Sequence, residues 1–234
     1  MLPLPSPNSD SVIRFTDRRE AGARLAQEVL AEFNREPALS AYPAVVYALP
    51  RGGLPIAAPI ARALHCPLDV IVAKKITRSD NTELAIGAVT ADGHVVWASP
   101  PSQKSGAAAL APDRPPNRLP QLAMEQAQNH AQAQLADLTA HTTPVSAHNA
   151  IALVVDDGIA TGMTMAAAVQ AVQAQNPYQI WICAPVAPQE IMPFLHHLGD
   201  RAIILETPHP FYSVSRFYQE FPQVSTEEAA AFLQ

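Results

Sequence analysis

The sequence predicts an α/β fold in which a parallel β-sheet is covered by helices on both faces. Segments of strand length alternate along the chain with segments that have the apolar period of a helix, the order that builds a parallel sheet. The strand segments are apolar at nearly every position, which is typical of a sheet buried on both faces. Because ligands of such sheets bind where the strands end, we expect functional residues directly after the strands.

Each expected element in the first half of the chain has its own signal. The first helix has apolar residues at a spacing of four from Ala21 to Phe33, and the second has Pro55 in its first turn. Asp92-Gly93 separates two short apolar runs, which predicts a hairpin. In order, the elements are a helix at 20–33, a strand at 43–49, a helix at 53–64, a strand at 68–73, a polar loop at 74–83, and a hairpin of 85–89 with 94–97.

The second half begins with a Pro-, Ser- and Ala-rich segment and continues with the alternation of strands and helices. The expected elements are an irregular stretch at 100–120, a Gln- and Ala-rich helix at 121–138, strands at 151–155, 179–184 and 202–205, and helices at 164–173 and 189–198. At 234 residues, the chain has the length of one domain. We expect a loose tail at 1–12 and a domain at 13–234.

Composition excludes several functional classes. The net charge is −6 and charged residues make up 15% of the chain, so the basic surface of a nucleic-acid-binding protein is missing. Cys66 and Cys183 are far apart and form no disulfide framework or zinc spacing, which is typical of a reducing cytosol. Residues 1–11 lack the basic and apolar parts of a signal peptide. The apolar runs are too short to span a bilayer, and we expect a cytoplasmic protein without membrane contact.

The most informative segment is 152–164, where an apolar strand ends in Asp156 and Asp157 and continues through a Gly- and Thr-rich loop into a helix. Backbone N–H groups at such a helix start bind phosphate, and carboxylates bind hydroxyls or a hydrated cation. The loop lacks the Gly-Lys-[Ser/Thr] of a P-loop and the G-x-G-x-x-G of a dinucleotide site. An ordinary strand-to-helix turn with an Asp cap explains one acid and one glycine, but not two acids, two glycines and two threonines.

Two further segments carry the positive groups that an anionic ligand requires. Pro50-Arg51-Gly52-Gly53 follows the first strand, and its glycines and arginine suit a bound anion, although strand-to-helix turns often contain glycine. Lys74-Lys75-Ile-Thr-Arg78 opens the expected polar loop. This run has two possible interpretations. It is either a solvated basic edge or a mobile loop that stabilises an anionic leaving group.

Other charged and aromatic groups have simpler interpretations. Four charges from Asp17 to Glu20 predict a surface salt-bridge cluster. Five aromatic residues between Phe211 and Phe221 predict a segment that packs back on the sheet, and one ring remains a candidate for stacking on a heterocyclic base. The eight histidines show no ligand spacing, so we expect them to be structural or exposed.

The 152–164 segment resembles the 5-phosphoribosyl-1-pyrophosphate (PRPP) motif of type I phosphoribosyltransferases. Together with Pro-Arg-Gly-Gly, Glu83-Leu-Ala-Ile-Gly-Ala-Val89 and the C-terminal segment from Phe217 to Glu228, it resembles stand-alone bacterial proteins usually labelled predicted phosphoribosyltransferases. The resemblance covers about 15–233 and is weakest at 99–149, where the group's Arg-rich helix is replaced by a Gln- and Ala-rich one. It implies the type I fold, with an insert at about 99–149 and a C-terminal hood at about 206–234.

The resemblance also implies roles for individual residues. Asp156 and Asp157 would hold the ribose, with Mg²⁺ bound nearby through substrate and water and not by a protein metal site. The implied substrate-binding residues are Arg51, Gly52, Gly53, Asp156, Asp157, Gly158, Ala160, Thr161, Gly162, Met163 and Thr164. The implied catalytic residues are Arg51, Lys74, Lys75 and Asp157.

The implied reaction transfers 5-phosphoribosyl from PRPP to a small heterocyclic acceptor and releases pyrophosphate. Enzymes for 6-oxopurines commonly have an acid where this chain has Ala160, so a nucleobase of another type is expected. A non-catalytic PRPP or nucleotide sensor, the reverse reaction and a phosphoribohydrolase remain open alternatives. A homodimer is implied by the resemblance alone.

Overall fold

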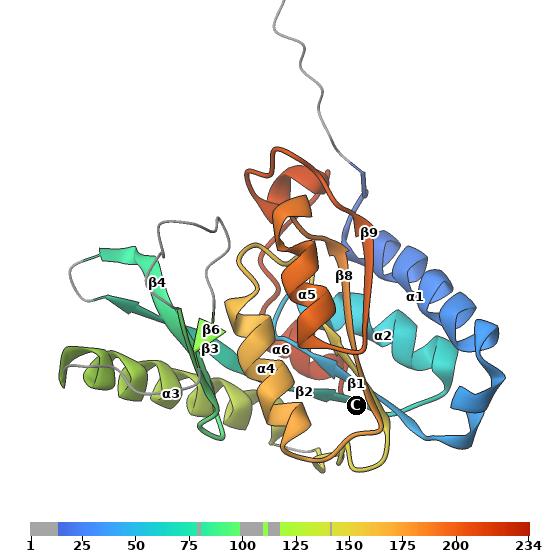
Figure 1. The fold of residues 1–234 in the computed structure, drawn as a ribbon, viewed down its shortest axis with the longest axis horizontal. Helices are drawn as coiled ribbons and strands as arrows, with labels where there is room; N and C mark the ends of the chain where they lie inside the picture. The colour runs from blue at the N-terminus through green and yellow to red at the C-terminus, as the bar shows by residue number, and fades with distance from the viewer. Residues whose placement is uncertain (1–13, 79–80, 99–109, 112–117, 141) are drawn as a thin grey trace, which may run out of the picture.

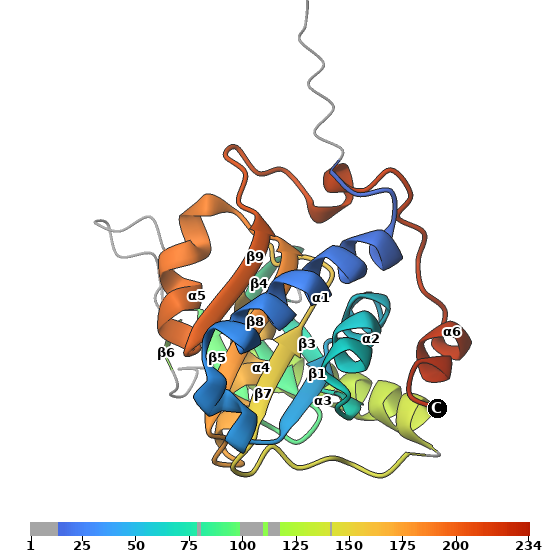
Figure 2. The same cartoon turned by 90° about the vertical axis from the view of Figure 1, so that its right-hand side faces the viewer.

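The computed structural model describes residues 14–78, 81–98, 110–111, 118–140 and 142–234 (Figure 1). The expected tail at 1–12 and most of the expected irregular stretch at 100–120 lie outside the described residues. Within them, the expected α/β architecture is confirmed (Figures 1 and 2). The division into a tail, a domain, an insert and a hood stays a prediction.

The central sheet has five parallel strands in the order β2-β1-β7-β8-β9. Their bounds are β1 (Ala44–Ala48), β2 (Leu68–Val70), β7 (Ile151–Val155), β8 (Gln179–Val186) and β9 (Arg201–Glu206). The two strands that precede the predicted site are neighbours, and their last residues, Ala48 and Val155, are paired. The segments after them therefore begin side by side at the same edge of the sheet.

Helices cover both faces of this sheet, as expected from its apolar strands (Figures 1 and 2). Alternate side chains, such as Leu153 and Trp181, pack with α1 (Arg18–Arg35) and α2 (Gly53–Leu64). The intervening side chains, such as Val154 and Ile182, pack with α4 (Met163–Gln173) and α5 (Met192–Leu198). A short 3₁₀ turn, η2 (Gln189–Ile191), precedes α5, so the predicted helix at 189–198 begins with a tighter turn.

A smaller antiparallel sheet has the order β3-β4-β5-β6. It consists of β3 (Ala73–Arg78), β4 (Asn81–Thr90), β5 (Val95–Ala98) and β6 (Leu110–Ala111). Ala127 and Ala131 of α3 (Arg118–Thr139) pack on one side of it, and Met163 and Ala166 of α4 pack on the other. The Gln- and Ala-rich helix therefore supports this sheet (Figure 1).

The predicted loop at 74–83 is wrong for the described residues, because 74–78 and 81–83 belong to paired strands β3 and β4. The predicted strand at 68–73 likewise ends at Val70, and Ala73 begins the second sheet. The sequence of β3 lacks a clear alternation of apolar and polar residues. Its fully buried apolar side chain is Ile76, which is flanked by Lys75 and Thr77. A single fully buried apolar residue within a polar run is too weak a pattern to predict a strand from sequence.

The C-terminal segment crosses the molecule after β9. It passes through η3 (Val214–Phe217), forms a bridge between Tyr218 and Phe15, and ends in α6 (Thr226–Ala231). Ser225 and Glu228 form a capping box at the start of α6. Figures 1 and 2 show α6 next to α2 and α3. The C-terminal segment therefore runs from β9 of the parallel sheet to the side of α3, the helix that packs on the antiparallel sheet.

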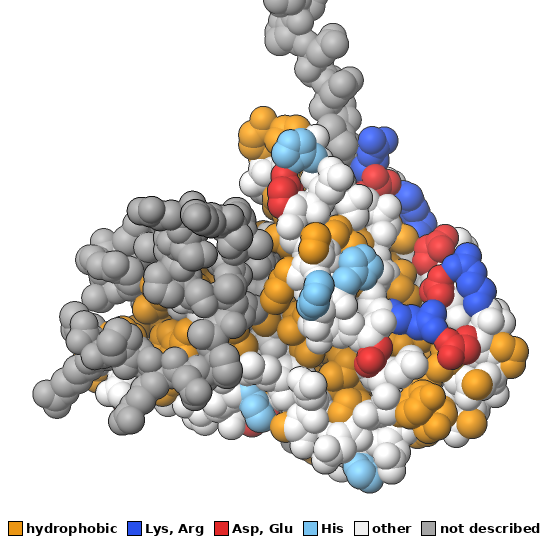
Figure 3. All heavy atoms as spheres, viewed as in Figure 1, with side chains coloured by type: hydrophobic (Ala, Val, Ile, Leu, Met, Phe, Trp, Pro, Cys, Tyr) orange, Lys and Arg blue, Asp and Glu red, His pale blue; other side chains and the backbone are white. Residues whose placement is uncertain are grey.

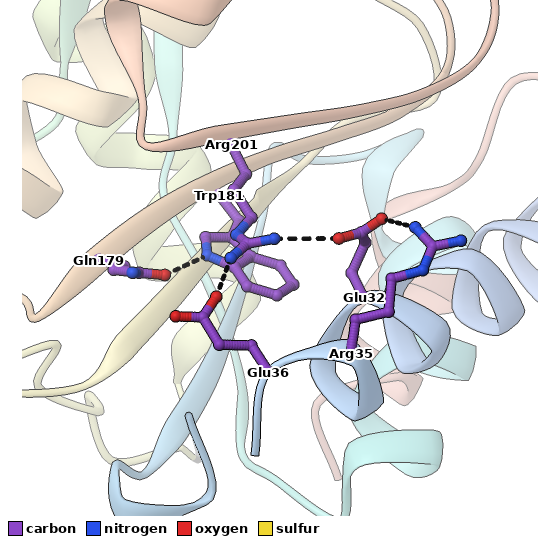
Figure 4. A network of polar contacts seen from close by, with 6 residues as sticks. All are labelled: Glu32, Arg35, Glu36, Gln179, Trp181 and Arg201. Atoms are coloured by element: carbon purple, nitrogen blue, oxygen red, sulfur yellow. Dashed lines mark hydrogen bonds and ion pairs between the residues drawn. The ribbon is translucent and has the colours of Figure 1, made fainter. Parts of the chain in front are cut away.

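Charged side chains of both signs alternate along the surface over α1 and β9 (Figure 3). At one end of this surface, Arg201 of β9 donates to Glu32 at 2.9 Å, forms an ion pair with Glu36 and lies 5.0 Å from the centre of the Trp181 ring (Figure 4). Arg35 pairs with Glu32 from a more exposed position. The network connects the C-terminal end of α1 to the sheet edge.

Arg201→Ala is expected to lower the free energy of unfolding by about 1 kcal/mol, because it removes two ion pairs and a cation–π contact from a half-buried position. Arg35→Ala is the matched control: it removes an exposed pair with the same Glu32 and should change stability by less than about 0.5 kcal/mol. Urea unfolding of both variants measures the difference. Equal losses would contradict the importance of the Trp181 contact.

None of the helices in the described ranges is both long and apolar enough to span a bilayer.

Candidate functional site

The two acids follow the fully buried strand β7 at the carboxyl edge of the sheet. The next turn leads to Gly162, which has φ +75° and is the N-cap of α4. A Cβ added at Gly162 would lie 2.8 Å from Cε1 of Phe194. The left-handed backbone and this close approach both require glycine, and the first N–H groups of α4, which have no acceptor within the helix, follow this turn.

The surroundings of Asp156 oppose the ionisation of its carboxyl group. Its Oδ1 accepts a hydrogen bond from the N–H of Asp157 at 2.8 Å. Burial, and then the adjacent charge of Asp157, raise the pKa of Asp156 well above its usual value, although the backbone hydrogen bond and Arg18 oppose the shift. Ionisation of Asp156 is therefore unfavourable in the ligand-free protein. A ligand rich in hydroxyl groups, or a cation, would make it more favourable.

Asp157 is paired with Arg18, the first residue of α1. Arg18 Nε donates to Asp157 Oδ2 at 2.7 Å, and the side chains are 10% and 16% exposed. The surface cluster predicted for 17–20 is therefore wrong for Arg18. The sequence held a signal for this position: Arg18 stands three residues before Ala21 on the buried stripe of α1, where a cation requires a partner.

The Pro50-Arg51-Gly52-Gly53 segment lies against both acids. It follows β1 and opens α2, and its first peptide bond, Pro50–Arg51, is cis. A Cβ at Gly52 would lie 2.0 Å from Asp157 Oδ2, and a Cβ at Gly53 would lie 2.8 Å from the carbonyl oxygen of Val155. Both glycines are thus required for the close approach of this turn to the acidic loop.

A cavity of about 720 Å³ opens beside Gly52, between β3, α3 and α6. It is lined by Arg18, Pro50, Arg51, Gly52, Lys74, Lys75, Ala127, His130, Ala133, Gln134, Asp137, Gln223, Val224 and Thr226. Burial and the nearby charge of Arg51 lower the pKa of Lys74. The structure therefore brings Arg51, Lys74 and Lys75 together from separate places in the sequence, and the lysines come from a strand and not from a loop.

Residues 160–164, which by the family resemblance would hold the 5-phosphate, lie in a separate turn and not in this cavity's lining. Ala160 and Thr161 are exposed, Thr164 is half-buried, and the Met163 side chain packs against the small sheet. Met163 can therefore offer a ligand only its backbone. A Cβ at Gly158 would lie 2.4 Å from Cγ1 of Val214, so the C-terminal segment packs directly on the loop.

Sequence reasoning missed several residues around the site. Besides Arg18, these are His130, Gln134 and Asp137 of α3, which line the cavity, and Thr226, which accepts a hydrogen bond from Arg51 at 3.2 Å. Gln134 Oε1 is buried and has no hydrogen-bond partner among the described residues. The three α3 residues stand at spacings of four and three, a helical face that could have been recognised only if α3 had been placed beside the site.

The aromatic C-terminal segment packs against the back of the site, as expected for most of its rings. Phe217 and Tyr218 are buried, and Tyr218 donates a hydrogen bond to the carbonyl oxygen of Asp157 at 2.7 Å. Phe221 lies under the Arg18 guanidinium at 3.6 Å. Tyr212 is 70% exposed, and the Arg216 guanidinium lies over its ring at 4.7 Å, so the candidate role of a ring in stacking on a base stays a prediction.

The described residues contain no group of three or more His, Cys, Asp or Glu side chains arranged to hold a metal ion.

Comparisons with known proteins identify this arrangement. The chain is 34% identical over 220 residues to a protein of Mycobacterium tuberculosis, found in strains CDC 1551 and H37Rv, whose name assigns it provisionally to the phosphoribosyl transferases. The match covers 94% of the chain and 46% of the relative, so the chain spans about half the length of these curated relatives. The protein TT1426 from Thermus thermophilus has the same fold, with a TM-score of 0.72, 29% identity, and coverage of 94% of this chain and 98% of TT1426.

The sequence model of the family described as "Phosphoribosyl transferase domain" matches residues 15–191, which include both glycine turns and the strand that carries the lysines. The chain therefore belongs to the phosphoribosyl transferase domain family.

Proposed function

We propose that the protein transfers the 5-phosphoribosyl group of PRPP to a nitrogenous acceptor and releases pyrophosphate. One observation carries the proposal: the acidic turn after β7 and the cationic turn after β1 lie in contact, with Gly52 against Asp157. A ligand that fits both turns has hydroxyl groups at one end and a polyanion at the other. PRPP has this combination.

In this proposal, each part of the ligand has its own binding residues. Asp156 and Asp157 accept hydrogen bonds from the ribose hydroxyls, and the backbone of 160–164 with the hydroxyls of Thr161 and Thr164 binds the 5-phosphate. Arg51, Lys74 and Lys75 bind the pyrophosphate, with the N–H group of Gly52; the N–H of Gly53 donates to the carbonyl oxygen of Leu49, so Gly53 contributes only the close approach of the turn. The cavity beside these cations is large enough for pyrophosphate.

The chemistry follows from this placement. The bond between C1 of the ribose and the pyrophosphate oxygen breaks, and its electron pair leaves with pyrophosphate. The acceptor nitrogen forms the new bond to C1 from the opposite face and loses its proton to solvent. Positive charge on the sugar and negative charge on the leaving group develop together, so the carboxylates and the cations stabilise opposite ends of the transition state.

Magnesium would fit this site, because PRPP and water would supply its oxygen ligands and the carboxylates of Asp156 and Asp157 would accept hydrogen bonds from those ligands. When bound, Mg²⁺ would neutralise part of the pyrophosphate charge. The two acids would hold it indirectly, through the ribose hydroxyls and water.

The acceptor is proposed to be a nucleobase other than a 6-oxopurine, because Ala160 stands where those enzymes commonly have an acid. A pure sensor of PRPP would bind the same ligand without transfer. Release of pyrophosphate separates the two: incubation with Mg²⁺, PRPP and single nucleobases should release pyrophosphate with at least one base. Binding of PRPP without pyrophosphate release for any base, or for water, would favour the sensor.

Arg51→Met is expected to weaken pyrophosphate binding at least tenfold, because it removes a half-buried charge that lies near Lys74 in the same cavity. Arg62→Met is the control: Arg62 is exposed in the last turn of α2, and this variant should bind pyrophosphate like the unmodified protein. Calorimetric titration of pyrophosphate measures both. Equal affinities in the two variants would remove Arg51 from the pyrophosphate site.

A further inference from the structure

The C-terminal segment forms one wall of the cationic cavity, through Gln223, Val224 and Thr226. Thr226 is the first residue of α6, which lies beside α2 and α3 (Figures 1 and 2). Its Oγ1 accepts a hydrogen bond from Arg51 Nη1 at 3.2 Å, across 175 positions of sequence. The turn after β1 and the C-terminal helix therefore meet at the site proposed for pyrophosphate.

Thr226 is held in place from both sides along the chain. Ser225 is the N-cap of α6 and forms a capping box with Glu228, which fixes the first turn of the helix. Before the helix, the carbonyl oxygen of Pro222 accepts a hydrogen bond from Arg18 Nη1 at 2.6 Å. These contacts give the Thr226 hydroxyl a defined position in the cavity wall.

The Arg51 side chain needs such a partner, because its neighbour in the cavity carries the same charge. Burial, and then the positive charge of Arg51, lower the pKa of Lys74, so the two cations lie close enough to repel each other. A long, half-buried side chain beside a like charge would otherwise populate several rotamers. The hydrogen bond to Thr226 favours those that keep the guanidinium at the cavity wall.

The group that holds Arg51 is a neutral hydroxyl and not a carboxylate. A carboxylate in this position would form an ion pair with Arg51 and compete with a bound anion for its N–H groups. Asp137 lines the same cavity, and Glu227 follows Thr226 in α6, yet both are exposed. Among the described residues, the side chain that accepts from Arg51 is Thr226. A guanidinium has several N–H donors, so the others remain available to a ligand.

We propose that Thr226 is a positioning residue for Arg51: its hydroxyl holds the guanidinium at the wall of the pyrophosphate cavity and leaves the positive charge available to the anion. This inference rests on the proposed function, in which Arg51 binds pyrophosphate. It gives the C-terminal helix a part in binding the leaving group without a contact between Thr226 and that group.

Calorimetric titration of pyrophosphate into Thr226 variants tests the inference. Thr226→Val has the same shape without the acceptor and should lower the affinity about fivefold. Thr226→Ser keeps the hydroxyl and should bind within about twofold of the unmodified protein. Thr139→Val is the matched control, because Thr139 is a half-buried threonine of α3 that donates to the carbonyl oxygen of Leu135 and is not part of the cavity lining. It should leave the affinity unchanged.

A double-mutant cycle with Arg51→Met separates positioning from direct contact. In the Arg51→Met protein, Thr226→Val should change pyrophosphate affinity by less than about 1.5-fold, because the hydroxyl no longer has a guanidinium to hold. An equal loss in both backgrounds would show that Thr226 contacts the anion itself or only supports α6, and would overturn the inference. Unchanged affinity in Thr226→Val alone would also overturn it.

Thr226→Asp tests the importance of a neutral acceptor. The new carboxylate should pair with Arg51 and lower pyrophosphate affinity about 20-fold, a larger loss than that of Thr226→Val. An acid in the first turn of a helix favours the helix, so unfolding of α6 would not explain this loss, and a thermal melt checks it. Affinity equal to or above that of Thr226→Val would contradict the inference.

These titrations need neither PRPP nor an acceptor, so the inference and the proposed function can fail separately. If the variants behave as expected but the unmodified protein releases no pyrophosphate from PRPP with any nucleobase or water, the transferase proposal fails and the role of Thr226 stands. If pyrophosphate is released but Thr226→Val binds it like the unmodified protein, the inference fails and the proposed function stands. Absence of pyrophosphate binding to the unmodified protein would refute the inference.

Discussion

Asp156→Asn is expected to abolish PRPP binding and, at the same time, to make the protein more stable at neutral pH. The amide has the shape of a protonated carboxyl group, so it can accept from the Asp157 N–H and donate to the Asp157 carboxylate. It removes the charge whose burial is unfavourable. We expect the free energy of unfolding at pH 7 to rise by about 1 to 2 kcal/mol and the affinity for PRPP with Mg²⁺ to fall about 100-fold.

The sign of the pH dependence follows from the raised pKa. Between the ordinary value and the raised one, the unfolded chain has lost a proton that the folded protein retains, so Asp156 lowers stability progressively as the pH rises through this window. The advantage of the asparagine variant should therefore be absent in acid and grow with pH until it levels off above the folded-state pKa. Urea unfolding between pH 4 and pH 8.5 measures it. An asparagine variant that is less stable at all pH values would show that the ionised acid is well accommodated.

Gly162→Ala is the second variant with a large expected effect. The residue has φ +75°, and the new Cβ would lie 2.8 Å from Phe194, so the turn must shift. We expect a loss of about 2 to 3 kcal/mol in the free energy of unfolding and at least a tenfold loss of PRPP affinity, because the N–H groups at the start of α4 move with the turn.

Gly93→Ala is the matched control for this backbone effect. Gly93 also has a positive φ, +96°, but the nearest atom to an added Cβ is the flexible end of Gln128, at 3.1 Å. This variant should lose about 1 kcal/mol of stability and bind PRPP like the unmodified protein. If both variants lost affinity equally, the loss would reflect general destabilisation and not the phosphate-binding turn.

Much of the fold could be predicted from the sequence because its signals are local. Strand β7 is apolar at all five positions and is followed at once by two acids and the glycine turn, and α2 begins and ends where its apolar period predicts. The location of both turns at one edge of the sheet also followed, since the carboxyl ends of parallel strands meet there, whereas the pairing of β1 with β7 came from the structure. These predictions needed no knowledge of distant contacts.

The remaining features depend on contacts between residues far apart in the sequence. Lys74 and Lys75 belong to a strand because β4 pairs with it and α3 packs on it, and neither partner is visible in the local pattern. Arg18 is 139 positions from Asp157, so its charge was assigned to the surface by its neighbours in the sequence. The α3 wall of the cavity was missed for the same reason, since its helix is far in the sequence from the strands that carry the cations.

The most direct test of the central claim is a calorimetric titration of PRPP into the protein with and without Mg²⁺, repeated with Asp156→Asn. The account predicts binding that requires Mg²⁺ and is lost in the variant, while the variant still binds pyrophosphate through Arg51, Lys74 and Lys75. PRPP binding that is unchanged in Asp156→Asn, or no binding by the unmodified protein in either condition, would contradict the assignment of this site to PRPP.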